Sequence, residues 1–191
     1  TFNLYVIKYK KIITMENKKK SEWDRLSKEL SSTTDKLGKP IDKGIIETVI
    51  ALNALGFKTK MSCEGHIGKS GRLLKHSLPF PWISIGFLKN EINLQKLPES
   101  KLPAAKRKIT KASFPLILEL MMLIDEFYKD RYTPLMYRVM AKHWTPNAFR
   151  IQSFIGPYME TQTQNERSKS YHNVKKEMRA FTLFLKKKFF Q

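Results

Sequence analysis

Residues 57–87, "FKTKMSCEGHIGKSGRLLKHSLPFPWISIGF", decide the fold because they place two strand-like segments on either side of a tight turn. Apolar and charged residues alternate from Phe57 to Met61, as they do in a half-buried strand. Residues 81–87 have the β-branched and aromatic content of a second strand. We therefore predict two strands connected through a segment that begins with the Cys-Glu-Gly-His run.

The segments before this stretch are predicted to be helical. In residues 40–56 apolar side chains recur at helical spacing, Asp42 lies near the start, and Gly56 stands where a C-terminal cap belongs. Residues 21–30 predict a shorter amphipathic helix. We expect residues 1–20 to be an N-terminal extension, disordered or translated upstream of a start at Met15, with a strand-like alternation around residues 4–7. The apolar stripe of the 40–56 helix is Ile45, Val49, Leu52 and Leu55.

The segments after the stretch complete an α+β pattern. Residues 89–111 are polar and basic and predict a loop, whereas residues 114–128 predict a helix with Met121 and Met122 in the core. Residues 132–141 and 147–155 alternate as strands do, residues 157–170 resemble a loop, and the C-terminal segment from residue 170 predicts an amphipathic helix with a basic end. The order favours a single α+β domain over residues 21–191, with a largely antiparallel sheet and amphipathic helices packed on it.

The charge and the cysteine content indicate which binding partners and which cellular compartment to expect. A formal charge of +19 attracts polyanions such as RNA, although 28 of the 36 basic residues are lysines, a bias that genome composition also produces. The single cysteine and the absence of a signal-like start favour the cytoplasm. The longest apolar run is interrupted by Glu119 and Asp125 and is too short to span a bilayer, so we expect no membrane partner.

The Cys-Glu-Gly-His run has two reactive interpretations. Zinc accepts thiolate and imidazole ligands, so Cys63 and His66 could bind a metal with His76 as a third ligand and Glu64 as a fourth ligand or a catalytic base. Alternatively, Cys63 is a nucleophile whose thiolate is stabilised by a neighbouring histidine. A purely structural interpretation stays open beside them, with Cys63 as a small buried side chain and Gly65 serving the turn.

A further interpretation needs no reactive thiol. The strand ends near Met61, and a turn over residues 62–65 exposes backbone N–H groups that, with Ser62, suit an anionic or polar ligand. Arg138 and Arg150 emerge from apolar surroundings and are expected at the same end of the sheet. Trp82 offers a ring that stacks on a base or packs in the core.

The region from Asp35 to Ile85 resembles the tRNA wybutosine-synthesising methyltransferase family that acts at the third step of that pathway. The resemblance implies an α+β fold, S-adenosylmethionine as methyl donor and an RNA base as substrate. This sequence departs from the family pattern at Met61, Glu64 and His66. The SCEGH and PWI motifs are also similar to those of bacterial proteins of unassigned function. The residues that carry the family resemblance are Asp35, Lys36, Gly38, Asp42, Asn53, Thr59, Ser62, Cys63, Gly65 and Trp82.

The leading hypothesis is thus a polar-ligand or RNA-facing site at the turn, with methyltransferase-like RNA modification as its activity. In that hypothesis Ser62 and Gly65 bind the ligand, Glu64 or His66 transfers a proton, and the lysine-rich loop and C-terminal helix attract phosphate. The alternatives are a metal-binding protein or hydrolase that uses Cys63, His66 and His76, and a non-catalytic interaction protein that binds through its C-terminal helix.

Overall fold

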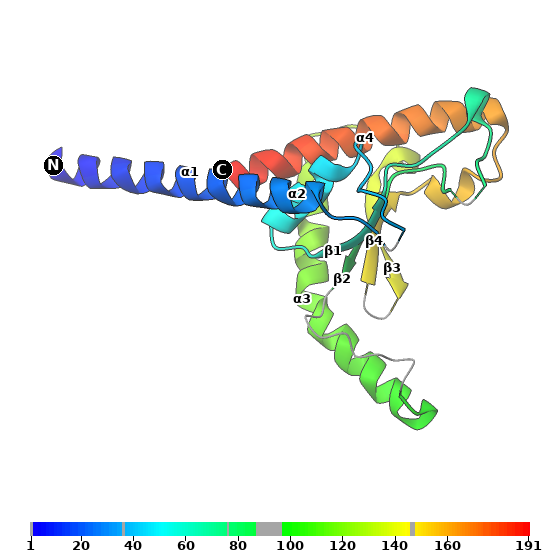
Figure 1. Cartoon of the computed structure of the whole chain (residues 1–191), viewed down its shortest axis with the longest axis horizontal. Helices are drawn as coiled ribbons and strands as arrows, with labels where there is room; N and C mark the ends of the chain where they lie inside the picture. Colours follow the sequence, from blue (N-terminus) through cyan, green and yellow to red (C-terminus); the bar gives the residue numbers. More distant parts are fainter. Residues whose placement is uncertain (1, 36, 76, 87–96, 146–147) are drawn as a thin grey trace.

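A computed structural model describes residues 2–35, 37–75, 77–86, 97–145 and 148–191, with side chains from residue 14 onward. The order of helices and strands along the chain is the predicted one, and the α+β class is confirmed (Figure 1). The helices and strands are α1 (Phe2–Ser31), α2 (Ile46–Ala54), β1 (Thr59–Cys63), β2 (Trp82–Gly86), α3 (Leu102–Tyr128), β3 (Val139–Thr145), β4 (Ala148–Ser153) and α4 (Gln164–Phe190).

The sheet is antiparallel throughout, with the strand order β1-β2-β4-β3. Cys63 at the end of β1 lies opposite Trp82 at the start of β2. On β2 and β4, Ser84 lies opposite Arg150. Because side chains alternate between the two faces of a strand, Cys63, Trp82, Ser84 and Arg150 belong to one face of the sheet.

The opposite face of the sheet forms the main core with α2, α3 and α4. Ile83 and Ile85 of β2 and Ile151 of β4 are fully buried there. A helix or a sheet must bury its apolar side, and three helices laid on one sheet face meet that need. The other members of this buried cluster are Ile45, Val49, Ala51, Leu52, Phe57, Leu120, Ile124, Phe127, Val139, Met178, Phe181 and Leu185.

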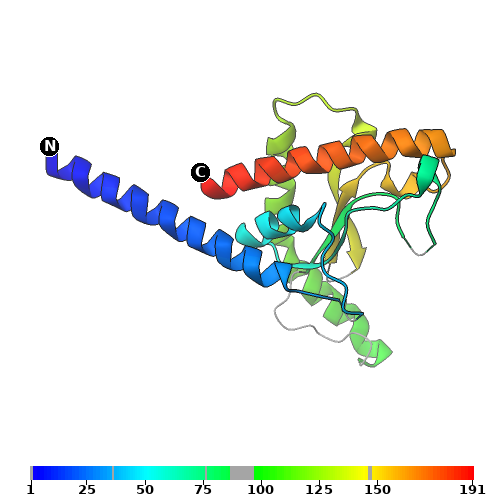
Figure 2. The same cartoon turned by 45° about the horizontal axis from the view of Figure 1, so that its top comes forward.

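The N-terminal helix is much longer than the sequence indicated. The expected strand around residues 4–7 is wrong, because α1 runs without interruption from Phe2 to Ser31, and its N-terminal end projects away from the rest of the molecule (Figures 1 and 2). The sequence contains no Gly or Pro before Gly38, so nothing breaks the helix once it has begun. Near its C-terminal end, the Trp23 ring contacts Phe189 and Phe190 of α4.

Two other helices begin earlier than expected. Helix α3 starts at Leu102, inside the segment predicted as a loop, with Pro103 in the first turn, where proline is tolerated. Helix α4 starts at Gln164, because Thr163 and Glu166 form a capping box. Met121 and Met122 are exposed on α3, so their expected place in the core is wrong.

One buried arginine fastens three segments together. Arg167 of α4 donates to the carbonyl oxygen of Met159 at 2.7 Å and to that of Gly71 at 2.8 Å. It also donates to the carbonyl oxygens of Glu160 and Gln162. The side chain is 6% exposed, so each guanidinium bond replaces one that water would otherwise make. This clamp ties the segment after the Cys-Glu-Gly-His turn to the start of α4.

Candidate functional site at the end of β1

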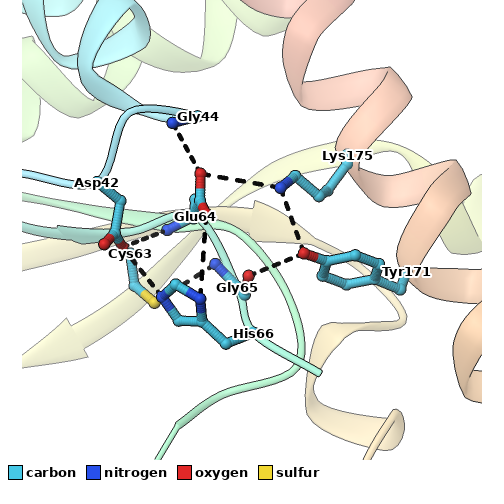
Figure 3. A network of polar contacts seen from close by, with 8 residues as sticks. All are labelled: Asp42, Gly44, Cys63, Glu64, Gly65, His66, Tyr171 and Lys175. Atoms are coloured by element: carbon cyan, nitrogen blue, oxygen red, sulfur yellow. Dashed lines mark hydrogen bonds and ion pairs between the residues drawn. The ribbon is translucent and has the colours of Figure 1, made fainter. Parts of the chain in front are cut away.

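The turn after β1 depends on glycine. Gly65 has φ of +77°, and a Cβ atom there would lie 2.5 Å from the backbone carbon of Phe80. The Gly65 N–H donates to the Cys63 sulfur at 3.4 Å, and the Tyr171 hydroxyl donates to the Gly65 carbonyl at 3.1 Å. The chain therefore reverses tightly and carries Cys63, Glu64 and His66 to one place (Figure 3).

Asp42 reaches the turn from the segment before α2. Its backbone carbonyl accepts from the N–H groups of Ile45 and Ile46, which fixes the start of that helix. Its carboxylate Oδ2 accepts from the Glu64 N–H at 3.0 Å and lies 3.2 Å from His66 Nε2 (Figure 3). The sequence placed Asp42 only near a helix start and in the family pattern, so its convergence with the turn is new.

Asp42, Cys63 and His66 form a cluster of three different donor types. One carboxylate oxygen, the thiol sulfur and one ring nitrogen all lie within 4.8 Å of one another, and the three residues are half-buried. In a tetrahedral zinc site, ligand atoms 2.0 to 2.3 Å from the metal are roughly 3.5 Å apart. Small side-chain adjustments would bring the three donors onto one ion.

Cys63 does not have the environment of a nucleophilic cysteine. Burial is the largest effect and raises the pKa of its thiol; the Gly65 N–H bond lowers it by less, and the nearby carboxylates of Asp42 and Glu64 raise it further. A catalytic thiolate needs a pKa lowered by a cation or a helix N-terminus. The thiol keeps its proton at neutral pH unless a positive ion replaces that proton.

Glu64 is held by three groups. Its Oε2 accepts from the Gly44 N–H at 2.7 Å and lies 3.8 Å from the Lys175 ammonium of α4. Its Oε1 lies 4.0 Å from His66 Nδ1, on the side of the ring away from Asp42 (Figure 3). Lys175 also donates to the Tyr171 hydroxyl at 3.2 Å. The sequence indicated no role for Lys175 or Tyr171, because nothing local links α4 to the turn.

The backbone amides of the turn are already used within the protein. The Glu64 N–H bonds Asp42, the Gly65 N–H bonds Cys63, and the His66 N–H donates to the Leu78 carbonyl at 3.0 Å. An anion would have to displace these contacts and approach two carboxylates. The geometry at this point therefore favours a cation over the anionic ligand considered from the sequence.

The two arginines expected at the turn lie elsewhere. Arg138 donates to the Thr133 carbonyl at 2.9 Å and its guanidinium lies over the Tyr128 ring. Arg150 lies in the middle of β4, with its guanidinium over the rings of Trp82 and Trp144. Neither makes a hydrogen bond or ion pair with a described residue of the turn. Ser62 lies opposite Ile83, on the other sheet face from Cys63.

The structure describes two of the other three histidines, His143 and His172. His76, the expected third metal ligand, lies outside the described residues, as does Lys36 of the family pattern. His143 is exposed and packs edge-on against Phe149, and the ring of His172 contacts the Ser168 carbonyl within α4. Among the described residues, Asp42 supplies the third donor atom beside Cys63 and His66.

Other positions of the family pattern support the scaffold. Asp35 Oδ1 accepts from the N–H groups of Leu37 and Lys39 and closes a local turn. Asn53 of α2 donates to the Thr59 hydroxyl at 2.7 Å, which ties that helix to β1. The contact between Asn53 and Thr59 fixes α2, which follows Asp42, relative to β1, which ends at Cys63.

Basic residues gather on α3 and α4. Lys106, Arg107 and Lys111 line an open groove of about 640 Å³ on the first half of α3, together with Thr110, Phe114 and Pro115. The apolar face of α4 is buried in the two cores, and its outward side is mostly polar, with Leu183 and Phe190 also exposed. Within the described part of the chain, no helix combines the length and the apolar character needed to cross a membrane.

Comparison of the chain with protein-family models, with curated proteins and with solved structures gives no match. The resemblance to the wybutosine methyltransferases, S-adenosylmethionine as cofactor and methyl transfer to RNA stay predictions, since none of the described contacts bears on them. Binding through the basic side of α4 by a non-catalytic interaction protein also stays a prediction.

Proposed function

We propose that the protein binds a divalent transition metal, with zinc the best fit, through Asp42, Cys63 and His66, and that it is a metal-dependent hydrolase. The observation that supports the proposal is the mutual approach of the three donor atoms within 4.8 Å. A mixed set of sulfur, nitrogen and oxygen ligands suits zinc rather than magnesium or calcium, which prefer oxygen alone. The three donors found among the described residues would leave a fourth position open, as catalytic zinc sites do.

The local charge supports a cation. Asp42 and Glu64 bring two carboxylates to the turn, and among the described residues Lys175 of α4 is the lysine that lies close to Glu64. A metal ion would also reverse the balance at Cys63, because a coordinated thiol loses its proton. The carboxylates that, together with burial, raise the pKa of the free thiol would also attract the ion.

Each neighbouring residue has a role in this proposal. Asp42 bonds the Glu64 N–H through the same carboxylate that faces His66, so it fixes the turn and the ligand set together. Glu64 faces the other ring nitrogen of His66, the arrangement by which carboxylates orient metal-binding imidazoles. A zinc ion in a three-ligand site lowers the pKa of a bound water to about 7. With zinc bound, Glu64 would be the residue that accepts the proton of that water in the proposed hydrolase.

Cobalt(II) titration of chelator-treated protein tests the metal site. We expect about one equivalent to bind, with the charge-transfer absorption of a cobalt-thiolate bond. Cys63→Ser should remove that absorption, and Asp42→Asn and His66→Ala should weaken binding by at least about tenfold. His172→Ala, which removes an exposed histidine of α4, is the matched control and should bind like the wild type. Binding of less than a tenth of an equivalent, or wild-type affinity in His66→Ala, would reject the site.

Hydrolysis is tested separately. The zinc-loaded protein should cleave activated esters such as bis(4-nitrophenyl) phosphate or 4-nitrophenyl acetate, and the chelator-treated protein should not. Glu64→Gln, measured at a zinc concentration that saturates it, should lose at least about tenfold in turnover. If the zinc-loaded protein cleaves neither ester faster than free zinc does, the hydrolase proposal is rejected, and the proposal of a metal-binding protein remains.

A further inference from the structure

A second cluster lies on the sheet face opposite to Ile83 and Ile151 of the main core. Arg150 is in the middle of β4 and is 6% exposed. Its guanidinium lies 4.2 Å from the centre of the Trp82 ring and 3.4 Å from that of Trp144. Ser84 lies opposite it on β2, and Lys142 lies opposite it on β3. The row Lys142, Arg150, Ser84 thus crosses three strands.

The guanidinium of Arg150 has no anionic or hydrogen-bonding partner among the described residues. Its Nε is buried without a hydrogen bond, and so are the Ser84 hydroxyl and the Trp82 indole N–H beside it. Burial lowers the pKa of Arg150, and no nearby carboxylate opposes that effect. Buried charges in proteins are normally paired, and each unpaired buried polar group calls for an explanation.

The chemistry of the cluster identifies the missing partner as an anion. Arg150 and the Trp82 indole offer only hydrogen-bond donors, and Ser84 can donate as well. Lys142 on the next strand is exposed and adds positive charge. A guanidinium binds phosphate through charge-assisted hydrogen bonds, and indole faces such as that of the half-exposed Trp144 stack on nucleobases. The formal charge of +19 would draw such a ligand to the protein.

We propose that Arg150, Ser84 and Trp82 form a binding site for the phosphate of a nucleotide, with Trp144 providing a surface for its base. This site does not depend on the metal site, whose ligands it does not share. Trp82 nevertheless links the two places, because it lies opposite Cys63 on the neighbouring strand and its ring contacts Arg150.

Isothermal titration of chelator-treated protein at about 0.15 M salt separates this proposal from the metal site. The three probes are inorganic phosphate, uridine monophosphate and an eight-residue oligouridylate. Saturable binding of the monophosphate assigns the site to a free nucleotide, and binding of the oligonucleotide alone assigns it to a single strand. Either result supports the proposal, whereas binding of none of the three, or of inorganic phosphate alone, overturns it.

Variants locate the binding. Arg150→Met should reduce affinity by at least about tenfold, and Ser84→Ala should reduce it less, in keeping with a charged and a neutral hydrogen bond. Arg25→Met removes the same charge from the exposed surface of α1 and should leave affinity within about twofold. Equal losses in Arg150→Met and Arg25→Met would show attraction by net charge alone and would overturn the site.

A stability measurement guards against misfolding of the variant. Removing an unpaired buried charge in favour of an apolar side chain is neutral or stabilising, so Arg150→Met should unfold at the wild-type temperature or above it. If Arg150 serves ligand binding, Arg150→Met should combine this gain in stability with the loss of affinity. If Arg150→Met unfolds at a lower temperature and Arg150→Gln binds the probe like the wild type, Arg150 is a packing residue and the proposal fails.

Discussion

Arg150 and Arg167 are buried to the same extent, each 6% exposed, yet Arg167 donates to four backbone carbonyls and Arg150 to no described group. The difference separates two uses of a buried arginine. Arg167 satisfies carbonyls that would otherwise lose their hydrogen bonds, so it holds loops together. Arg150 has the rings of Trp82 and Trp144 beside its charge but no anion or hydrogen-bond acceptor among the described residues, an arrangement that a bound anion would complete.

Arg167→Met should lower the free energy of unfolding by about 3 kcal/mol or more, because several buried carbonyls lose their donor at once. Urea unfolding followed by circular dichroism measures the change. Arg25→Met is a suitable control, because Arg25 and its partners Glu22 and Glu29 are exposed on α1 and their ion pairs should contribute less. Equal losses of unfolding free energy in the two variants would contradict the proposed role of Arg167 in holding the three segments together.

Metal affinity should rise with pH through the neutral range. Because the pKa of the Cys63 thiol is raised, the metal-free protein holds this proton, and binding must release it. With one proton displaced, affinity should increase about tenfold per pH unit until the pH reaches the thiol pKa. Titrations between about pH 7 and 8.5 measure the slope. Cys63→Ser should flatten it, and an affinity independent of pH in the wild type would exclude thiolate coordination.

Gly65→Ala should disrupt the turn. The substitution places a methyl group against the Phe80 backbone and imposes a positive φ on alanine, so we expect a loss of about 2 kcal/mol or more in stability. Gly38→Ala separates the two effects, because Gly38 also has a positive φ but nothing lies within 4 Å of the added carbon. Gly65→Ala should therefore cost more than Gly38→Ala in thermal unfolding, and equal costs would show that the contact with Phe80 is unimportant.

Glu64→Gln should weaken metal binding as well as turnover. The carboxylate faces His66 Nδ1, and loss of such a partner typically reduces metal affinity by about tenfold or more. Glu47→Gln is the matched control, since Glu47 pairs with Lys186 on the exposed surface. Competition titration with a chromogenic chelator compares the two variants. An unchanged affinity in Glu64→Gln would leave proton transfer as the only role of Glu64.

The order of helices and strands was predictable because it depends on local periodicity. The stripe that contains Ile45, Val49 and Leu52 is buried as expected, and the two strands around the turn form with small shifts in their bounds. The early start of α4 could also have been found, because Thr163 and Glu166 have the spacing of a capping box. The length of α1 followed from the absence of helix breakers, a signal that the alternation near residues 4–7 obscured.

The composition of the candidate site was predictable only in part. Cys63, Glu64 and His66 are neighbours in sequence, and the turn that unites them is signalled by Gly65. Asp42 and Lys175 join them through tertiary packing of the segment before α2 and of α4, which no local pattern encodes. The expectation that Arg138 and Arg150 converge on the turn did not hold, because a strand residue's neighbours depend on register.

The pairing of Cys63 with Trp82 has an optical consequence. An indole ring one strand away from the thiol is a natural fluorophore beside the proposed metal ligand, and the same ring contacts the Arg150 guanidinium. Its emission would respond to a paramagnetic ion on one side and to a bound nucleotide on the other. With Trp23 replaced by phenylalanine, the emission of the two remaining indoles, Trp82 and Trp144, would report the occupancy of both places without any attached label.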